Sequence, residues 1–366
     1  MRVVWAGTFD PEFSRNKKLA RLMDMSGIDV RTVRETVWSA DRIALAGRPS
    51  LRVALKALIA YPVLLVRLLR VPTPDLYLVT YPGWFDVPVV RLVATLRRKQ
   101  VVFDPFLSLH DTMISDRALH SHTSLVARFA RLIDRLSLRL ADFVIADTYP
   151  QLDLYEALSG GLRRGGGVLE VGADDQVFVP HSQLAPEPNV VLYYGKLIPL
   201  HGVRTIVEAA GRLRSDDVRM VMIGDGPERL VLEEAMRQTG AVIERHGMLA
   251  LEELPAHVAR ASICLGVFGG SDKAGRVIPH KVYEAMAMRR PVITRDGPAV
   301  RSTFPNGDVV TVPPDDPVAL AEAIQSLLAD GSSRDRIAAA GYESYRRRFH
   351  ERPLASALLR ILEARI

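Results

Sequence analysis

The sequence has little cysteine, no long uncharged apolar run and no low-complexity tract. A single cysteine, Cys264, occurs among 366 residues, so no internal disulfide can form. It lies in an apolar run at 263–268, which predicts a buried core residue rather than a nucleophile. The chain begins with only a short apolar run before charges appear, which predicts a first β-strand and no signal peptide. We therefore expect a cytoplasmic protein.

The charge is moderately basic, with 48 Lys and Arg against 42 Asp and Glu, a formal net charge of +6. This excess favours an anionic partner such as a nucleotide, an acidic lipid surface or a phosphorylated carrier, and we expect no nucleic acid. Pro62 and several cations flank or interrupt the apolar stretch at 53–69, which makes it a poor membrane-spanning helix. Two interpretations are open: a helix at the lipid interface, giving peripheral contact through residues 42–70, or an amphipathic helix packed on a sheet.

Length and periodicity predict two α/β domains. Short β-branched runs alternate with helical patterns, which is typical of parallel βαβ units. A Pro- and Asp-rich stretch at 171–189 predicts a linker. We expect one domain at 1–175, a second at 186–345, and a final helix at 346–366 that packs back on the first. The expected strands are at 3–6, 30–33, 76–80, 101–104, 143–146 and 168–171, then at 190–194, 219–223, 242–245, 263–267, 291–294 and 309–312.

Ligands of open parallel sheets bind at the carboxyl ends of strands, where helix N-termini favour phosphate. After the expected strand at 190–194, Gly195 and Gly202 would let the backbone approach an anion, while Lys196 and His201 supply donors. A tight turn with exposed polar side chains explains this segment equally well.

Two later strand ends in the second half, after the strands expected at 219–223 and 263–267, are also rich in glycine. One carries Gly224 and Gly226 in a turn into a helix, which is not a G-x-G-x-x-G motif and signals function weakly. The other runs through a Gly-rich loop to Arg276, Lys281 and Glu284. Such a loop can hold a pyrophosphate with amides and cations, leaving a carboxylate for ribose hydroxyls. The alternative is that Glu284 only stabilises a helix N-terminus. The two neighbouring strand ends with anion-binding features favour a binding site over this alternative.

Polar residues also follow strands of the first half. Gly7, Arg15 and Asn16 form a loop that could face a cleft. His110 and Asp111 belong to a polar cluster able to bind hydroxyls or accept a proton, and a structural hydrogen-bonding role for His110 is the alternative. The other members of this cluster are Asp104, Asp116 and Arg117.

The segments VGADDQVFVP, GKLIPLHG, IGDGP and PHKVYEAMAMRRPVIT, in this order and spacing, resemble the retaining glycosyltransferases of family 4. Those enzymes have the GT-B fold, in which two Rossmann-like domains with parallel sheets face each other across a cleft. The resemblance is strongest at 172–349. It implies that Glu284 contacts the nucleotide ribose, that Lys281 holds the pyrophosphate, and that Lys196 and His201 stand at the phosphate-binding Arg and Lys. Arg276 stands where the family has its first glutamate, which is a departure from the pattern.

The resemblance also implies that the first domain binds the acceptor and the second binds the donor, with Gly7, Arg15 and Asn16 near the donor phosphates. The sequence has no D-x-D pair in a metal-binding context at a strand end, and we expect neither a metal nor a cofactor besides the nucleotide-sugar donor. Positive groups and helix dipoles would take the place of the metal.

The expected activity is transfer of a sugar from a nucleotide diphosphate sugar to a hydroxyl acceptor with retention, in polysaccharide, glycolipid or other cell-envelope glycan synthesis. Lys196, Lys281 and Arg276 would stabilise the departing diphosphate. His110 and Asp111 would orient the acceptor, and the basic apolar stretch suggests that the acceptor is lipid-linked. Two alternatives are open: a catalytically degenerate partner or scaffold subunit, and a sugar-nucleotide epimerase, for which no clear pair of carboxylates is seen.

Overall fold

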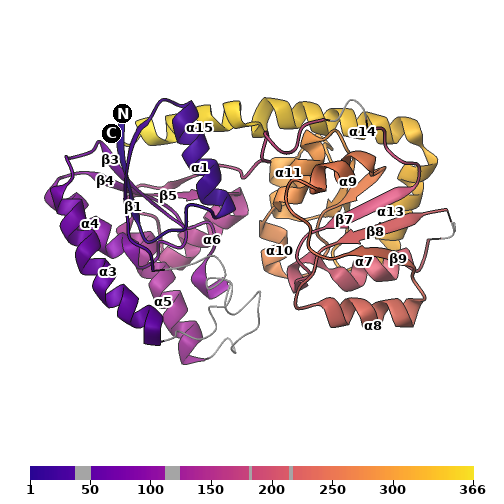
Figure 1. Cartoon of the computed structure of the whole chain (residues 1–366), viewed down its shortest axis with the longest axis horizontal. Helices are drawn as coiled ribbons and strands as arrows, with labels where there is room; N and C mark the ends of the chain where they lie inside the picture. The colour runs from indigo at the N-terminus through magenta and orange to yellow at the C-terminus, as the bar shows by residue number, and fades with distance from the viewer. Residues whose placement is uncertain (38–50, 112–123, 181–183, 214–216) are drawn as a thin grey trace. The chain divides into compact units, whose positions relative to one another are not determined.

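We analysed a computed structural model that describes residues 1–37, 51–111, 124–180, 184–213 and 217–366 (Figure 1). The chain forms two compact units. Unit 1 comprises Met1–Glu170 and Arg352–Ile366, and unit 2 comprises Val171–Glu351. Most of the Pro- and Asp-rich stretch expected to be a linker therefore counts with unit 2.

Unit 1 contains a six-stranded parallel sheet in the order β2-β1-β3-β4-β5-β6. The chain changes direction across the sheet between β1 and β3, which are neighbours. Its strands are β1 (Arg2–Gly7), β2 (Asp29–Arg34), β3 (Leu76–Thr80), β4 (Gln100–Asp104), β5 (Phe143–Ala146) and β6 (Gly166–Val168).

The position of β6 differs from the strand expected at 168–171, because two of its three residues are glycines with no strand propensity. A Cβ on Gly166 would lie 2.3 Å from Cδ1 of Leu152, so there is no room for a side chain at this position on the edge of the sheet. Packing against a neighbouring helix thus sets the pairing here, and this contact leaves no signal in the local sequence.

Helices cover both faces of the unit 1 sheet, because alternate strand residues point to opposite faces. Val4 and Tyr77 pack with residues of the helices on one face, whereas Val3 and Leu76 pack with those on the other. The first face carries α3 (Leu51–Arg70), α4 (Asp86–Leu96), α5 (Leu125–Leu140) and α6 (Tyr149–Ser159). The second carries α1 (Ser14–Met25) and α15 (Glu351–Glu363), so the last helix packs within unit 1 (Figure 1).

No helix in the described parts of the chain has the length and apolar character needed to cross a bilayer. The apolar stretch at 53–69 forms most of α3, in which Leu64 and Leu68 are buried against the sheet. Residues 42–50 of the predicted membrane contact lie outside the described residues.

Unit 2 contains a second six-stranded parallel sheet, in the order β12-β11-β10-β7-β8-β9. From β7 the chain adds strands in one direction and then crosses back to begin β10 on the other side. Its strands are β7 (Val190–Tyr194), β8 (Arg219–Ile223), β9 (Ile243–His246), β10 (Ile263–Leu265), β11 (Val292–Arg295) and β12 (Val310–Val312). The predicted α/β class with two parallel sheets is confirmed.

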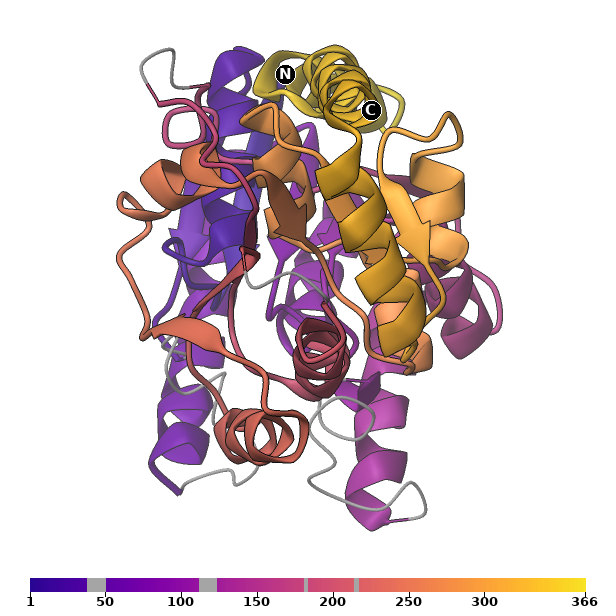
Figure 2. The ribbon, with the colours of Figure 1, turned by 90° about the vertical axis from the view of Figure 1, so that its right-hand side faces the viewer.

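One face of the unit 2 sheet packs against α7 (Val203–Ala210), α8 (Arg229–Thr239) and α13 (Pro317–Ala329), and α7 contacts both of the others (Figure 2). The other face packs against α11 (His280–Ala287), which contacts β10 and β11. The remaining elements are η2 (Pro199–His201), α9 (Leu254–Arg260), α10 (Asp272–Arg276), α12 (Pro298–Thr303), α14 (Gly331–Ser344) and the π-helical turn η3 (Tyr345–Phe349).

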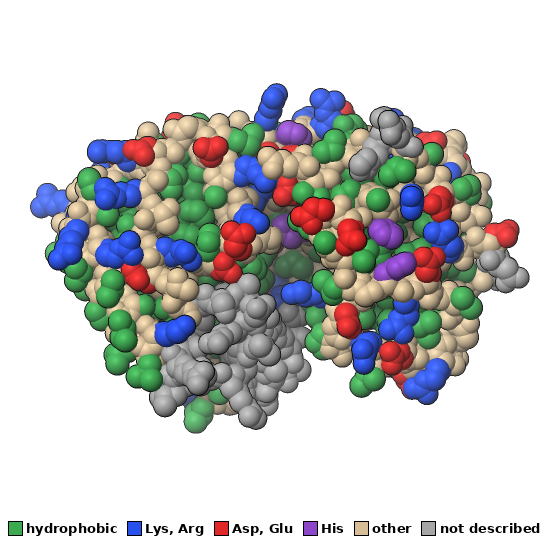
Figure 3. Space-filling view, in the orientation of Figure 1, with side chains coloured by type: hydrophobic (Ala, Val, Ile, Leu, Met, Phe, Trp, Pro, Cys, Tyr) green, Lys and Arg blue, Asp and Glu red, His purple; other side chains and the backbone are tan. Residues whose placement is uncertain are grey.

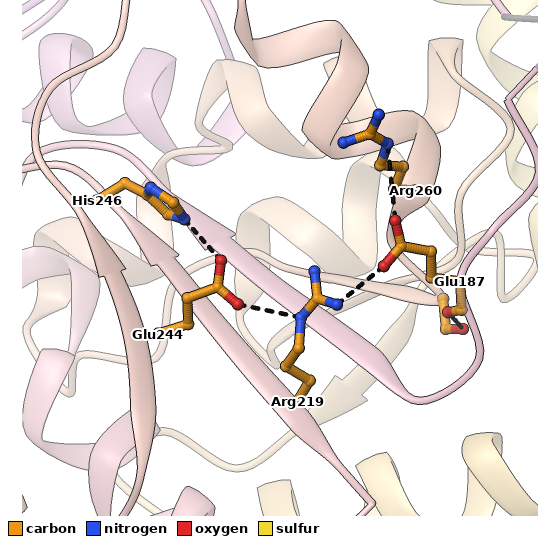
Figure 4. Close-up of polar contacts among 6 residues, drawn as sticks. Glu187, Arg219, Glu244, His246 and Arg260 are labelled. Atoms are coloured by element: carbon orange, nitrogen blue, oxygen red, sulfur yellow. Dashed lines mark hydrogen bonds and ion pairs between the residues drawn. The ribbon is translucent and has the colours of Figure 1, made fainter.

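A chain of ion pairs connects neighbouring strands at the surface of unit 2 (Figure 4). Arg219 contacts Glu187 at 2.9 Å and Glu244 at 3.1 Å. Glu244 in turn lies 2.8 Å from His246, and Glu187 lies 3.6 Å from Arg260. All five side chains are about a third to a half exposed, so each pair contributes little to stability, roughly 0–1 kcal/mol.

Candidate functional site

The loops that follow β7 and β10 meet at the point where the unit 2 sheet changes direction. This is the place at which open parallel sheets bind their ligands. Gly202 has φ 67°, and a Cβ there would lie 2.5 Å from the amide nitrogen of Gly269. The amide of Phe268 donates to the carbonyl of His201 at 3.1 Å. The predicted glycine thus serves close backbone packing between the two loops.

Lys281 lies in the first turn of α11, and its side chain is buried there. Its Nζ lies 3.9 Å from the centroid of the Tyr193 ring, and a Cβ on Gly195 would lie 3.0 Å from the same atom. Within the described residues this buried Nζ has no hydrogen-bond partner. Burial lowers the pKa of Lys281 to about 7, against the attraction of Glu284. The ammonium is therefore desolvated and only partly compensated, which favours an anion beside it.

Glu284 follows Lys281 by three residues and thus lies on the same side of α11. Burial raises its pKa to about 7, against a hydrogen bond from Tyr194 and the charge of Lys281, which lower the pKa, and with a smaller contribution from Asp174 in the same direction as burial. A half-buried carboxylate beside a buried ammonium can accept hydrogen bonds from hydroxyl groups of a ligand whose phosphates lie at the ammonium.

His201 ends η2 and is buried. Its Nδ1 lies 2.5 Å from the carbonyl oxygen of Lys196 and 2.7 Å from the Tyr193 hydroxyl. A carbonyl only accepts, so Nδ1 carries the proton and Nε2 the lone pair. Burial and then the charge of Lys281 lower the pKa of His201 to about 2. The residue is therefore a neutral imidazole that holds the Lys196 backbone.

Lys196 itself is exposed. It lines an open hollow of about 600 Å³ at the carboxyl ends of β7 and β8. The other lining residues are Asp225, Gly226, Pro227, Arg229, Leu230 and Met248.

The glycines after β7 and β8 allow these two loops to touch. A Cβ on Gly224 would lie 2.0 Å from the carbonyl oxygen of Gly195, and a Cβ on Gly226 would lie 2.5 Å from that of Leu197. The amide of Leu197 also donates to the carbonyl of Asp225 at 3.0 Å. Gly224 and Gly226 are thus needed for loop packing, which places Lys196 beside the hollow.

Arg276 ends α10 and is half-buried just before the segment that leads into α11. The structure also identifies a cation that the sequence did not indicate, Arg295 at the end of β11. Its Nη1 donates to the carbonyls of Gly269 at 2.6 Å and Ser271 at 3.0 Å. Arg295 therefore fixes the Gly-rich loop. The sequence did carry a signal for Arg295, since a cation directly follows the strand expected at 291–294.

In unit 1, Gly7 is the last residue of β1, at the point where that sheet changes direction. A Cβ there would lie 2.4 Å from Oδ2 of Asp86, which also accepts from the Thr8 amide at 2.7 Å. Burial raises the pKa of Asp86 to about 6. The space left by the missing side chain is thus filled by a carboxylate from the N-terminus of α4.

Arg15 and Asn16 are buried in α1, and their side chains have hydrogen-bond and ion-pair partners inside unit 1. Arg15 contacts Oδ2 of Asp104 through Nε at 2.9 Å and Nη2 at 2.8 Å. Asn16 Nδ2 donates to the carbonyls of Asp10 at 2.7 Å and Tyr81 at 2.9 Å. Asn16 thus holds the loops after β1 and β3. The guanidinium of Arg15 is compensated by Asp104, so it is not among the cations proposed for a diphosphate.

The His110 segment is held by Asp134, a buried residue of α5 that the sequence did not indicate. Asp134 accepts from the amides of Leu109 and His110, both at 2.9 Å, and from the Ser108 hydroxyl at 2.7 Å. Asp111 is buried next to it, with its amide donating to Ser108 Oγ at 3.0 Å. Asp116 and Arg117 of the predicted cluster lie outside the described residues.

Comparisons with known proteins match the part of the chain that carries this site. The sequence model of the glycosyl transferases group 1 matches residues 188–330. The alpha-D-kanosaminyltransferase of Streptomyces kanamyceticus is 28% identical over 289 residues, 76% of this chain and 67% of that protein. The phosphatidyl-myo-inositol mannosyltransferase of Mycobacterium leprae is 31% identical over 188 residues, 50% of this chain and 49% of that one. The matches thus span about two thirds of the first relative and about half of the second.

Solved structures match over nearly the whole chain. Anabaena HepE in complex with UDP has a TM-score of 0.72 at 16% identity, covering 99% of both chains. Sucrose-phosphate synthase from Thermosynechococcus elongatus has a TM-score of 0.72 at 19% identity, covering 99% of this chain and 98% of that one. At these identities the likeness shows the fold alone. Together, the comparisons show that residues 188–330 are similar in sequence to the glycosyl transferases group 1, and that the two parallel six-stranded sheets have the GT-B fold.

Proposed function

We propose that this protein is a retaining glycosyltransferase of family 4 that transfers a sugar from a nucleotide diphosphate sugar to a hydroxyl acceptor in cell-envelope glycan synthesis. The observation that supports this most is the Lys281 ammonium, which is buried at the direction change of the unit 2 sheet without a hydrogen-bond partner among the described residues. A diphosphate beside it would supply the missing negative charge.

The chemistry requires stabilisation of the departing diphosphate, and cations placed there lower the barrier most. In this proposal Lys281 contacts the diphosphate, while Arg276 and Lys196 add positive charge from the neighbouring loops. Glu284 binds the ribose hydroxyls. These cations act in place of a bound metal, and the reaction needs no cofactor beyond the donor. His110 and Asp111 orient the acceptor hydroxyl.

The test is binding and turnover of nucleotide sugars, starting with UDP because the structurally similar HepE was solved with UDP. We expect UDP to raise the melting temperature of the wild type and Lys281→Met to abolish this rise. Arg237→Ala is the matched control, because it removes a cation that is 73% exposed on α8. Equal stabilisation of Lys281→Met by every nucleotide diphosphate that binds the wild type would overturn the phosphate assignment. Binding without any transfer or hydrolysis would favour the scaffold alternative.

We also propose that the acceptor is reached at a membrane surface by peripheral contact of α3, α4 and α5 at its cytoplasmic face. These neighbouring helices cover one face of the unit 1 sheet, and large apolar side chains point outward from them. Exposed arginines lie on the same helices, including Arg67, Arg70 and Arg128. Figure 3 shows Lys and Arg side chains interspersed with hydrophobic ones on the face of unit 1 that it presents. This combination is typical of interfacial helices on anionic lipid. The apolar residues more than half exposed include Leu58, Ile59, Leu96, Leu125, Phe129 and Leu132.

Sedimentation with vesicles tests this contact. The wild type should pellet with phosphatidylglycerol vesicles and release at high salt. Ile59→Glu combined with Leu96→Glu should reduce the pelleted fraction at least about tenfold, since burying each side chain contributes about 1.5–3 kcal/mol. Val242→Glu is the control, because Val242 is 88% exposed in unit 2. Equal pelleting of all three proteins would remove the proposal.

A further inference from the structure

A second basic site lies in unit 1, at the amino-terminal edge of its sheet. A pocket of about 310 Å³ opens there, beside the residues that precede β3, β4, β5 and β6. Six cationic and two acidic side chains line it. The cations are Arg91, Arg98, Lys99, Arg163, Arg164 and Arg365. We call it the amino-edge pocket. It is distinct from the candidate site, which lies in unit 2 and at the opposite, carboxyl-terminal edge of its sheet, where ligands of parallel sheets bind.

Asp142 is the only carboxylate deep in this pocket among the described residues, with 3% of its side chain exposed. It accepts from Arg91 Nη1 at 2.5 Å and from the Val101 amide at 3.0 Å. Arg163 and Arg164 only approach it, at 3.4 and 4.0 Å, and both are about half exposed. The Asp142 carboxylate therefore compensates the charge of Arg91 well and that of Arg163 and Arg164 only weakly, which leaves these two guanidinium groups able to bind an anion.

The second acid of the pocket, Asp75, also leaves an excess of positive charge there. Asp75 already accepts from the backbone amide of Arg2 at 2.7 Å, which is the main reason that its pKa is lowered. Arg365 stacks its guanidinium carbon 3.9 Å from the centroid of the Phe143 ring. Its Nε is buried and has no hydrogen-bond partner within the described residues. A buried donor without an acceptor is the kind of group that a bound anion satisfies.

Arg98 adds a cation at a position where the backbone favours glycine. Its φ is 55°, and it directly follows Arg97, the C-cap of α4, with its amide donating to the carbonyl of Thr95 at 3.2 Å. Glycine is the usual residue at such a helix end, since a side chain there is strained. Replacing Arg98 by glycine therefore removes a charge from the pocket without disturbing the fold.

We propose that the amino-edge pocket binds a small anion carrying phosphate groups, about the size of inorganic diphosphate. The pocket volume is at the lower end of the range for small-ligand sites. Guanidinium groups bind phosphate oxygens in pairs, and several arginines match a multiply charged anion better than a carboxylate. The proposal does not depend on the function proposed for unit 2.

Calorimetric titration with inorganic diphosphate tests it in the Lys281→Met protein, which lacks the phosphate contact proposed in unit 2. We expect one diphosphate per chain, at least tenfold weaker binding in Arg98→Gly, and a further loss in Arg163→Ala with Arg164→Ala. Arg98→Gly should melt no lower than its parent, so lost binding would not reflect unfolding. Arg237→Ala should bind diphosphate unchanged. Absence of saturable binding in the Lys281→Met protein, or equal affinity in Arg98→Gly, would overturn the proposal.

A second arm identifies the source of the phosphate. Vesicles containing phosphatidic acid are compared with neutral vesicles, using Arg98→Gly and its parent. Tenfold weaker vesicle binding in Arg98→Gly supports a lipid headgroup in the pocket. Unchanged vesicle binding, together with lost diphosphate binding, supports a free phosphate compound.

Discussion

The Lys281 ammonium lies 3.9 Å from the centroid of the Tyr193 ring, and this contact is its main compensation inside unit 2 besides the charge of Glu284. A cation–π contact contributes about 0.5–2 kcal/mol, whereas burying an ammonium costs several kcal/mol. Burial of this ammonium therefore costs folding free energy, and an anion bound beside it would offset that cost.

Lys281→Met should raise the free energy of unfolding measured without nucleotide, while it abolishes nucleotide binding. Because the pKa of Lys281 falls to about 7 in the fold, the charged lysine opposes folding below that pH. This opposition fades as the pH rises from 7 towards the ordinary lysine value of about 10.4. We expect a gain of about 1–4 kcal/mol in the free energy of unfolding at pH 6, measured in urea. The gain should shrink at pH 10, and an equal gain at both values would contradict this account.

Nucleotide binding should weaken as the pH rises above 7. The diphosphate requires a charged Lys281, and the free protein loses that proton near pH 7. The affinity for UDP should fall up to about tenfold per pH unit until the pKa of the bound lysine is reached, with proton uptake visible as a buffer-dependent heat. Lys281→Arg keeps its charge to high pH and should lack this slope if it still binds. A flat profile in the wild type would contradict the contact between ammonium and diphosphate.

Two substitutions, Gly240→Ala and Gly224→Ala, separate the cost of a left-handed backbone from the cost of a steric clash between loops. Gly240→Ala meets nothing within 4 Å but has φ 68°, so it should cost only the left-handed penalty of about 1–2 kcal/mol. Gly224→Ala has φ 137° and would bring its Cβ to 2.0 Å from the Gly195 carbonyl. We expect Gly224→Ala to be destabilised more than Gly240→Ala in urea and to lose UDP binding as well. Equal destabilisation would show that the loop contact is not tight.

The sequence predicted the sheets well where strands are continuous apolar runs. The strands at 76–80, 143–146, 190–194 and 219–223 are confirmed to the residue, and nearly all of their residues are buried. The sequence also placed Lys281 and Glu284 close together, because they share one helix turn, and their binding of a donor stays a prediction. Local pattern was enough in these cases.

Distant partners could not be predicted from the sequence. Arg15 was expected to reach a ligand, yet its acceptor Asp104 is 89 residues away along the chain. The partner that fills the space beside Gly7, Asp86, is likewise set by the sheet order. A single sequence shows that a residue can donate, but only the fold shows which acceptor takes the bond.

Cys264 should report unfolding. Its side chain is buried and burial raises its thiol pKa to about 12, so almost no thiolate is present at pH 8. A disulfide reagent should label the native protein only as fast as it opens, and urea should accelerate labelling in step with loss of helical signal. Labelling of one thiol within seconds in native buffer would contradict the burial. UDP should slow labelling if the nucleotide stabilises unit 2, because Cys264 lies in β10.

Asp134→Ala should loosen the segment that carries His110. It would leave the amides of Leu109 and His110 and the Ser108 hydroxyl without their acceptor, at a cost of about 1–3 kcal/mol. Burial raises the pKa of Asp134 to about 6, so its ionisation opposes folding, and the wild type should lose stability as the pH rises from 4 through 6. The difference between wild type and Asp134→Ala in the free energy of unfolding should therefore shrink over the same interval. Asp153→Ala, at an exposed position of α6, is the control and should show neither effect. An identical pH profile for wild type and Asp134→Ala would mean that the buried carboxylate does not hold this segment.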